Sequence, residues 1–338
     1  MTGLSNLLVP AVLFFALGFL ARVIRSDLRF PPEMAKALSI YLLVAIGIHG
    51  GYELGKADLL TALHAILWAV VLGVTLPVLG YFVLVATKRV DGLNAAAIAA
   101  HYGSVSAGTF LTAIAFLKSV DVDYETYPVI MLAVMEAPAI VVGLLLAAWT
   151  RRWMRNANGA PAAGDTPAAE AGSAGLGHIL RDAFTNGSVV LLIGSMFIGT
   201  VATPASIDSI KPFVNEIFMG VLCLFLLEMG LEAARRIEDF RRVGTLLVVF
   251  GILMPVASGL LGIVVGYGVL GFGVGGTTLV AVLAASASYI AVPPAMRLAV
   301  PEANPSLYLT LSLGVTFPFN VIVGIPLYYK IATAVAGV

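Results

Sequence analysis

The chain contains ten apolar stretches, each long enough to cross a lipid bilayer, and this pattern limits its fold more than any other feature. A transmembrane helix needs roughly 17 to 25 predominantly apolar residues. Hydrophobic residues make up 60% of the chain and charged residues 11%, whereas about a quarter of the residues in soluble domains are charged. The sequence therefore predicts an integral, all-α membrane protein. The predicted spans are 4–22, 34–52, 59–87, 93–118, 127–150, 183–202, 212–233, 243–270, 275–299 and 306–335.

The predicted spans fall into two sets of five, with a polar segment between them. Residues 156–177 are rich in Ala, Gly and Pro and contain Asp165 and Glu170. Such a segment cannot bury an apolar face, so we expect a linker there. The predicted organisation is a first five-helix repeat over 1–155, a cytoplasmic linker over 156–177 and a second, inverted five-helix repeat over 178–338. The first stretch has no positive charge before it, so we expect a permanent span and not a cleavable signal peptide.

Several short patterns recur in the two halves at a nearly constant separation. Gly51 in the first half and Gly230 in the second are each followed two positions later by Glu. Pro138 and Pro318 are separated by almost the same length of chain as these glycines. An odd number of spans in each repeat makes the second copy enter the membrane upside down, and the binding site of such transporters lies between the copies. The sequence therefore predicts a 5+5 inverted repeat.

Lys and Arg are unevenly distributed between the two ends of the predicted spans. Because Lys and Arg accumulate in short cytoplasmic loops, we expect the more basic side to face the cytoplasm, with the linker inside and both termini outside. The formal net charge is zero, and no basic patch could follow a phosphate backbone, which argues against a nucleic-acid partner. The basic side carries Arg22, Arg25, Arg29, Lys36, Lys88, Arg89, Arg151, Arg152, Arg155, Arg181, Arg235, Arg236, Arg241, Arg242 and Arg297. The other side carries Lys56, Lys118, Lys211 and Lys330.

Two Ser-x-Ser pairs, Ser104/Ser106 and Ser286/Ser288, occupy matching points in the two halves, with nearly the same separation as the glycines and prolines. Each pair interrupts a predicted span near mid-depth. Glycines flank the first pair and allow the backbone to leave the helix, and two prolines that lack amide donors follow the second. A matched pair of interrupted spans is the sequence pointer to a transporter's binding site. The alternative interpretation is that these small residues only support close packing between helices.

A helix that begins at such a break can hold a small anion without Lys or Arg. Its first N–H groups are unpaired and its dipole is positive at that end. Serine hydroxyls add donors, and hydroxyl and carbonyl oxygens can also ligate Na⁺. We therefore expect an anion and a sodium ion together. The predicted substrate-binding residues are Gly103, Ser104, Ser106, Ala107, Ser286, Ala287 and Ser288.

Glu136 lies about ten residues into the fifth predicted span. An ionisable side chain at that depth is costly and usually functional, so Glu136 is expected to bind the coupling cation, to carry a proton or to bond to neighbouring backbone. The corresponding place in the second half offers the neutral oxygen donors Thr316 and Asn320. The candidate Na⁺ ligands are Ser104, Thr109, Glu136, Ser288, Thr316 and Asn320.

The sequence offers little for catalysis. No Ser-His-Asp, paired-carboxylate or His-rich metal arrangement occurs at membrane depth, so an enzyme is not expected. The chain has one cysteine, Cys223, and a disulfide within it is therefore impossible. We expect no cofactor apart from Na⁺ as the coupling ion.

Three segments resemble a known family: His101–Ala107, Ser286–Pro293 and Pro301–Tyr308. They are similar to the sodium-dependent bicarbonate transporters of cyanobacteria and other bacteria. The resemblance implies ten helices in core and gate domains, a homotrimer in the cell inner membrane, and high-affinity bicarbonate uptake coupled to Na⁺. It also implies substrate bound where two broken helices cross, and regulation by a small nucleotide-binding protein of the PII type on the cytoplasmic face.

Several alternatives stay open at this point. Within transporters, the chain could carry a carboxylate, sulfate or another small anion with Na⁺, or exchange a cation for protons through Glu136. In a different class, it could be an anion channel or a sensor that binds an anion without moving it.

Overall fold

A computed structural model describes residues 10–157, 187–236 and 244–337, and every regular element in these ranges is a helix. The first half contains α1 (Pro10–Val23), α2 (Pro32–Leu54), α3 (Leu59–Ala86), α4 (Gly92–Gly103), α5 (Ala107–Ser119) and α6 (Tyr127–Ala157). The second half begins with α8 (Gly187–Val201), α9 (Pro204–Lys211), η2 (Pro212–Glu216), α10 (Phe218–Arg235), α12 (Thr245–Ile263) and η4 (Val264–Val269). It ends with α13 (Val274–Ala285), α14 (Val292–Ala299), α15 (Pro305–Leu309), η5 (Thr310–Thr316), α16 (Phe317–Phe319), η6 (Asn320–Gly324) and α17 (Ile325–Ala336).

The lengths and compositions of these helices confirm the membrane class. Six of the described helical segments are long and apolar enough to span a membrane, and three shorter apolar helices accompany them. The six are Glu33–Leu54, Leu59–Ala86, Tyr127–Met154, Pro204–Arg235, Thr245–Val269 and Pro305–Ala336. Of the predicted segments, residues 4–9 of the first span, 183–186 of the sixth, 243 of the eighth and 158–177 of the linker lie outside the described residues.

An apolar stripe along α3 shows which side of that helix faces lipid. Leu59, Leu63, Leu67, Val70 and Val74 repeat at helical spacing and are 38% to 74% exposed. Large apolar side chains turned outward in one stripe are unfavourable in water and favourable against lipid tails. The chain is therefore a multi-pass membrane protein.

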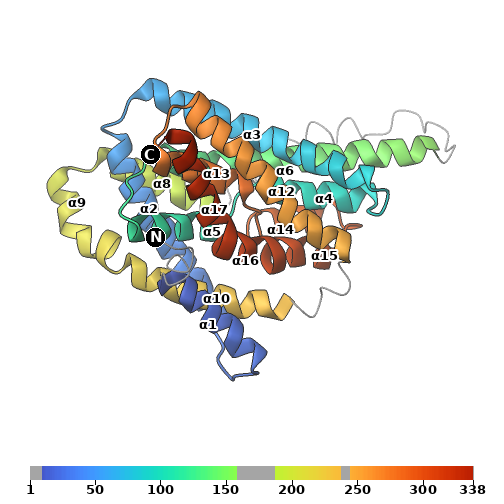
Figure 1. The fold of residues 1–338 in the computed structure, drawn as a ribbon, viewed down its shortest axis with the longest axis horizontal. Coiled ribbons are helices and arrows are strands. Elements are labelled where there is room, and N and C mark those ends of the chain that lie inside the picture. The colour runs from blue at the N-terminus through green and yellow to red at the C-terminus, as the bar shows by residue number, and fades with distance from the viewer. Residues whose placement is uncertain (1–9, 158–186, 237–243, 338) are drawn as a thin grey trace.

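Four helices form one packed group, called here the paired-helix group, in which α1 packs on α10 and α2 packs on α8. In Figure 1, α1 and α10 lie together at the lower side of the molecule, away from α3 and α12. Glycines allow the backbones to touch: a Cβ at Gly18 would overlap the Leu227 carbonyl oxygen, and one at Gly230 would overlap that of Phe15.

The contact between α2 and α8 repeats this arrangement. A Cβ at Gly51 would overlap the carbonyl oxygen of Met196, and one at Gly199 would overlap that of Ile48. Gly18 and Gly51 of the first half correspond to Gly199 and Gly230 of the second, at nearly the same separation along the chain. The two helix pairs therefore use equivalent residues with the roles of the halves exchanged.

Most of the remaining helices form a second group, called here the broken-helix group, around α4 and α13, whereas α9 packs on η2, and η2 packs on α2 and α10. Residues 95–100 of α4 are 0% exposed and residues 279–285 of α13 are at most 1% exposed. The helices α3, α6, α12 and α17 pack against these two. Backbone that leaves the helix at membrane depth is tolerated only where protein or a water-filled cavity surrounds it, and this enclosure meets that condition.

Candidate functional site

The two breaks lie side by side at the centre of the broken-helix group. The Ser288 N–H donates to the carbonyl oxygen of His101 at 2.8 Å. The Ser106 N–H donates to Ser286 Oγ at 3.0 Å, and that hydroxyl in turn donates to the Leu283 carbonyl oxygen at 2.9 Å. Two motifs from opposite halves of the sequence therefore meet through direct hydrogen bonds.

A small cavity lies against this crossing, with about 20 Å³ open to the centre of a water-sized sphere. A cavity of that size accommodates roughly one water molecule. Its walls come from both helix groups, because α2 and α8 contribute on one side and α5, α6 and the breaks on the other. The lining residues are Ser39, Leu43, Val105, Ser106, Ala107, Leu132, Ala133, Glu136, Leu192, Ser288, Tyr289 and Ile290.

The serines of the first break have different environments. Ser106 is the N-cap of α5: its Oγ accepts hydrogen bonds from the N–H of Thr109 at 3.2 Å and from the Thr109 hydroxyl at 2.9 Å. Neither bond uses the hydroxyl proton of Ser106, so this proton is available to another acceptor. Ser106 lines the cavity. Ser104 is 1% exposed, and its Oγ has no hydrogen-bond partner among the described residues. Ser106 therefore positions both a helix start and a hydroxyl at the cavity.

In the second break, as in the first, only the second serine of the pair lines the cavity. Ser286 is used by the bridge to Ser106, so its hydroxyl is already occupied. Ser288 lines the cavity, and its backbone N–H is fixed by His101. Each break therefore contributes one serine hydroxyl to the cavity wall.

The helix starts beside the breaks are unequal. The helix α5 begins at Ala107, directly at the cavity, and the N–H groups of Ala107 and Gly108 belong to the first turn, which has no acceptors within the helix. The helix α14 begins only at Val292, well after α13 ends at Ala285, and its first turn contains prolines that have no N–H. The positive helix end at the cavity is therefore supplied by α5.

Glu136 of α6 reaches the cavity. It lines the same walls as Ser106 and Ser288, and its Oε2 is buried without a hydrogen-bond partner in the described part of the chain. A carboxylate in that situation is stabilised by a cation or by a proton. The described residues contain no group of three or more His, Cys, Asp and Glu that could hold a metal ion, so Na⁺ would depend on hydroxyl and carbonyl oxygens around this carboxylate.

Thr316 and Asn320 have other partners. The Thr316 hydroxyl donates to the carbonyl oxygen of Gly251 at 2.7 Å and is bonded to the hydroxyl of Tyr102 at 2.6 Å. Asn320 Nδ2 donates to the carbonyl oxygen of Ala285 at 2.8 Å, where it satisfies an acceptor at the end of α13. Neither residue lines the cavity.

Of the other predicted residues, one lines the cavity and three lie behind its wall. Ala107 lines the cavity. Gly103 packs against Pro77 of α3, where a Cβ would collide with the proline ring. Ala287 is 2% exposed within the apolar core beside α4. Thr109 reaches the cavity only through its bonds to Ser106.

The structure adds three residues that the sequence analysis did not single out. Ser39 and Tyr289 line the cavity. Tyr289 directly follows the second serine pair, which was a signal, whereas nothing in the sequence context of Ser39 distinguishes it. Glu228 lies in α10 and lines a larger neighbouring vestibule of about 540 Å³. An ionisable residue inside a predicted span was a signal that could have identified Glu228.

The vestibule adjoins the cavity, because Ser39, Leu43, Tyr289 and Ile290 line both. Its other walls come from α2, α8, α10, α15 and η5. Its charged lining residues are Lys36, Glu228, Glu232 and Arg236.

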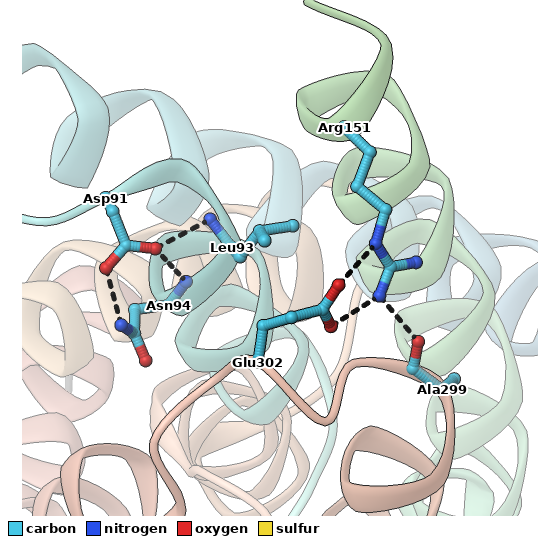
Figure 2. A network of polar contacts seen from close by, with 6 residues as sticks. All are labelled: Asp91, Leu93, Asn94, Arg151, Ala299 and Glu302. Carbon is cyan, nitrogen blue, oxygen red and sulfur yellow. Dashed lines mark hydrogen bonds and ion pairs between the residues drawn. The ribbon is translucent and has the colours of Figure 1, made fainter. Parts of the chain in front are cut away.

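A polar network holds the loop between α14 and α15 against the ends of α4 and α6, as Figure 2 shows. Arg151 donates to both Glu302 carboxylate oxygens, at 3.1 and 2.7 Å, and to the carbonyl oxygen of Ala299 at 2.9 Å. Hydrogen bonds from Arg151 hold the pKa of the Glu302 carboxyl below its usual value. Asn94, next to the Asp91 cap of α4, accepts from the N–H of Asn304 at 2.7 Å.

A second contact from the same loop region reaches the first break. Tyr308 of α15 stacks on the ring of His101, with centroids 4.4 Å apart, and both residues are buried. Because the His101 carbonyl accepts the hydrogen bond from Ser288, this stack supports the crossing itself. The segment Pro301–Tyr308 therefore acts as a support for the site.

These features define a multi-pass membrane protein with a cavity where two broken helices cross, in which Ser106, Ser288 and Glu136 lie among apolar residues. Broken helices that meet at a site are typical of secondary transporters. Residues 10–333 match the family described as the Na⁺-dependent bicarbonate transporter superfamily, and the chain belongs to that family. The resemblance in the sequence is therefore confirmed over nearly the whole chain. A comparison with curated proteins gives no match.

Proposed function

We propose that this protein takes up bicarbonate together with Na⁺ by alternating access, at the cavity beside the crossing of the two breaks. Membership of the family supports bicarbonate and Na⁺ as the transported ions. The observation that carries the proposal is that Ser106, Ser288 and Glu136 line one cavity whose walls come from both helix groups. A site shared between two bodies changes its access when one body moves against the other.

The anion is held by the start of α5 and by hydroxyl groups. The N–H groups of Ala107 and Gly108 and the positive end of the α5 dipole favour a negative charge, and Ser106 and Ser288 donate from the two breaks. Ser104, Ser286 and Ala287 complete the substrate region as its second layer. Gly103 sets the position of the first break against α3.

The sodium ion occupies the side of the cavity near Glu136, whose negative charge offsets the cation next to a bound anion. Of the other predicted hydroxyl ligands, Ser288 lines the cavity, whereas Ser104 and Thr109 lie behind its wall and act indirectly. Thr316 and Asn320 act indirectly in this scheme, because their bonds to Gly251 and Ala285 keep the ends of neighbouring helices in place.

The proposed architecture is a ten-span, 5+5 inverted repeat made of residues 1–155 and 178–338 around a cytoplasmic linker, 156–177. Two observations support it: the equivalent glycine contacts of α1–α10 and α2–α8, and the meeting of the two breaks. The paired-helix group would be the gate domain and the broken-helix group the core domain.

Transport in this scheme requires the cavity to widen. Bicarbonate has four non-hydrogen atoms, and the present cavity accommodates roughly one water. Movement of the core against the gate would open the cavity towards the vestibule on one side, and the opposite movement would open it on the other. The distribution of Lys and Arg supports an orientation in the cell inner membrane in which both termini lie outside the cytoplasm. A homotrimer and a PII-like cytoplasmic regulator are further proposals that rest on the family alone.

Uptake by reconstituted protein tests the proposal. Liposomes would be given labelled bicarbonate with an inward gradient of Na⁺, K⁺ or choline, at a pH where bicarbonate exceeds CO₂. Saturable uptake with Na⁺ only is the expected result. Folded, inserted protein that gives no uptake above empty liposomes would overturn it, and a current that does not saturate would indicate a channel.

Glu136→Gln tests the cation site separately. It removes a charge while keeping the side-chain shape, so we expect the Na⁺ concentration for half-maximal uptake to rise about tenfold or more. The matched control is Glu53→Gln, because Glu53 lies at the end of α2 in an exposed pair with Lys56 at 3.2 Å. An unchanged sodium requirement in Glu136→Gln would remove Glu136 from the coupling site.

A further inference from the structure

The vestibule contains one acidic side chain that the site described above does not use. Glu228 lines its wall from α10, and the buried Oε2 of Glu228 has no hydrogen-bond partner among the described residues. Its neighbour one turn later, Glu232, differs, because both of its oxygens are bonded by Arg235 and Arg236 at 3.0 to 3.2 Å. Of the two acids in this wall, Glu228 is the one left to interact with a mobile ion.

The location of Glu228 connects two parts of the molecule. The vestibule shares Tyr289 and Ile290 with the small cavity, so these two residues stand between Glu228 and the predicted ion site. Lys36 and Arg236 line the same vestibule at its basic end, the side that the distribution of Lys and Arg assigns to the cytoplasm. Glu228 precedes Arg235 by two helical turns, which is about 10 Å along a helix. An ion leaving the cavity for the cytoplasm would pass this carboxylate.

The equivalent position in the first half is not acidic. Gly51 and Gly230 are equivalent, and two positions before them lie His49 and Glu228. His49 lies near the end of α2, shortly before Glu53 and Lys56, on the less basic side of the molecule. The carboxylate is therefore a property of one half only, so it gives one of the two access paths a preference for cations that the repeat alone would not provide.

We infer that Glu228 is a cation-binding residue of the cytoplasmic vestibule, where it accepts Na⁺ as the ion leaves the cavity and before it reaches the basic mouth. The identity of the ion rests on the proposed function. The carboxylate lowers the barrier for a monovalent cation in a vestibule with a largely apolar lining, where an unpaired charge on the ion would otherwise be costly. The first test does not depend on transport.

The first test measures the local charge with thiol reagents. In a Cys223→Ala background, Ser39→Cys places a single thiol where the vestibule meets the cavity. A membrane-impermeant methanethiosulfonate, either cationic or anionic, is added to inside-out vesicles, so that it reacts from the cytoplasmic face. We expect Glu228→Gln to lower the ratio of cationic to anionic reaction rates about five- to tenfold, as the loss of one nearby charge predicts, and Na⁺ to slow the cationic reagent only when Glu228 is present.

Two controls define the comparison. Lys36→Gln removes a positive charge from the same vestibule and should change the ratio in the opposite direction. Glu216→Gln removes an exposed carboxylate outside the vestibule and should leave the ratio unchanged. A ratio that Glu228→Gln does not change, or a thiol that reacts only from the opposite face, would overturn the inference.

The second test uses transport. In oriented liposomes, Glu228→Gln should raise about fivefold or more the Na⁺ concentration needed on the cytoplasmic side for bicarbonate efflux, while the requirement on the other side stays within about twofold. Equal increases on both sides would contradict a role restricted to the vestibule. If the wild-type protein moves no bicarbonate, the proposed function fails, and the reagent ratio still decides the role of Glu228.

Discussion

The two breaks carry the same Ser-x-Ser pair, yet they are built for different tasks. The first break is short, and Ser106 caps α5 so that a helix begins directly at the cavity. The second break is longer, and α14 begins at Val292 without a side-chain cap. The matched sequences therefore produce one helix start at the cavity and one extended segment that crosses it. Repetition of a motif predicts where a site lies, and the residues that follow the motif decide what each copy does.

The largest effect is expected from variants that add or remove a single methyl group at the residue directly before each serine pair. Gly103→Ala would drive a Cβ into the Pro77 ring, so we expect a loss of stability of about 1 to 3 kcal/mol and little transport. The corresponding residue of the second break, directly before Ser286, is already Ala285. Ala285→Gly should cost only about 0.5 to 1 kcal/mol. Thermal unfolding in detergent compares the two, and equal effects would mean that the breaks are equally crowded.

The next test separates the two hydroxyls at the cavity. Ser106→Ala and Ser288→Ala each remove a donor to an anion, which is worth about 1.5 to 3 kcal/mol, so the KM for bicarbonate should rise about tenfold or more in both. Only Ser106→Ala also removes a helix cap, and its stability should fall by about 1 kcal/mol. Unchanged uptake in both variants would show that the site is elsewhere.

Ser286→Ala has an intermediate expected effect. It removes the bridge between the Ser106 N–H and the Leu283 carbonyl, and a neutral hydrogen bond of this kind contributes about 1 kcal/mol. We expect a fall of a few-fold in uptake rate with little change in KM, since no cavity hydroxyl is lost. Uptake by this variant and by Ser288→Ala would be measured side by side. A KM effect as large as that of Ser288→Ala would mean that Ser286 contacts the anion itself.

The smallest expected effect concerns the support behind the second break. The pKa of Glu302 is held below its ordinary value of 4.5 by Arg151, so the stability from this pair is present above that value and is lost as the pH falls through the lowered pKa. The pair is solvent-exposed, and its contribution is about 1 kcal/mol or less. Glu302→Gln should remove this pH-dependent part, which melting curves between neutral pH and pH 4 or below would reveal.

Much of the fold follows from the sequence because the period and length of apolar residues dictate membrane helices. Apart from α9 (Pro204–Lys211), which lies between the predicted sixth and seventh spans, the described helices lie over the predicted apolar ranges, and the breaks fall at the two serine pairs. Hydrogen-bond partners on neighbouring helices could not be predicted in the same way. The sequence offered Thr316 and Asn320 as cation ligands, but their hydrogen bonds to Gly251 and Ala285 depend on how α12 and α13 pack.

Ser39 could not have been selected either, because it becomes a cavity residue only when α2 meets the second break. A lone Ser in an apolar helix has many ordinary functions, such as close packing. Glu136, by contrast, was identifiable without any structure, since the cost of burying a carboxylate is a property of the residue itself.

The glycine contacts of the paired-helix group have a consequence for how this family can diverge. Gly18, Gly51, Gly199 and Gly230 each face a main-chain carbonyl across the helix pair, and no rotamer change can make room for a larger residue there. The lipid-facing leucines of α3 have no such restriction. In related sequences, we therefore expect these four positions to remain glycine long after the outer surface has been replaced, and a relative that lacks one should have lost its partner at the other end of the same pair.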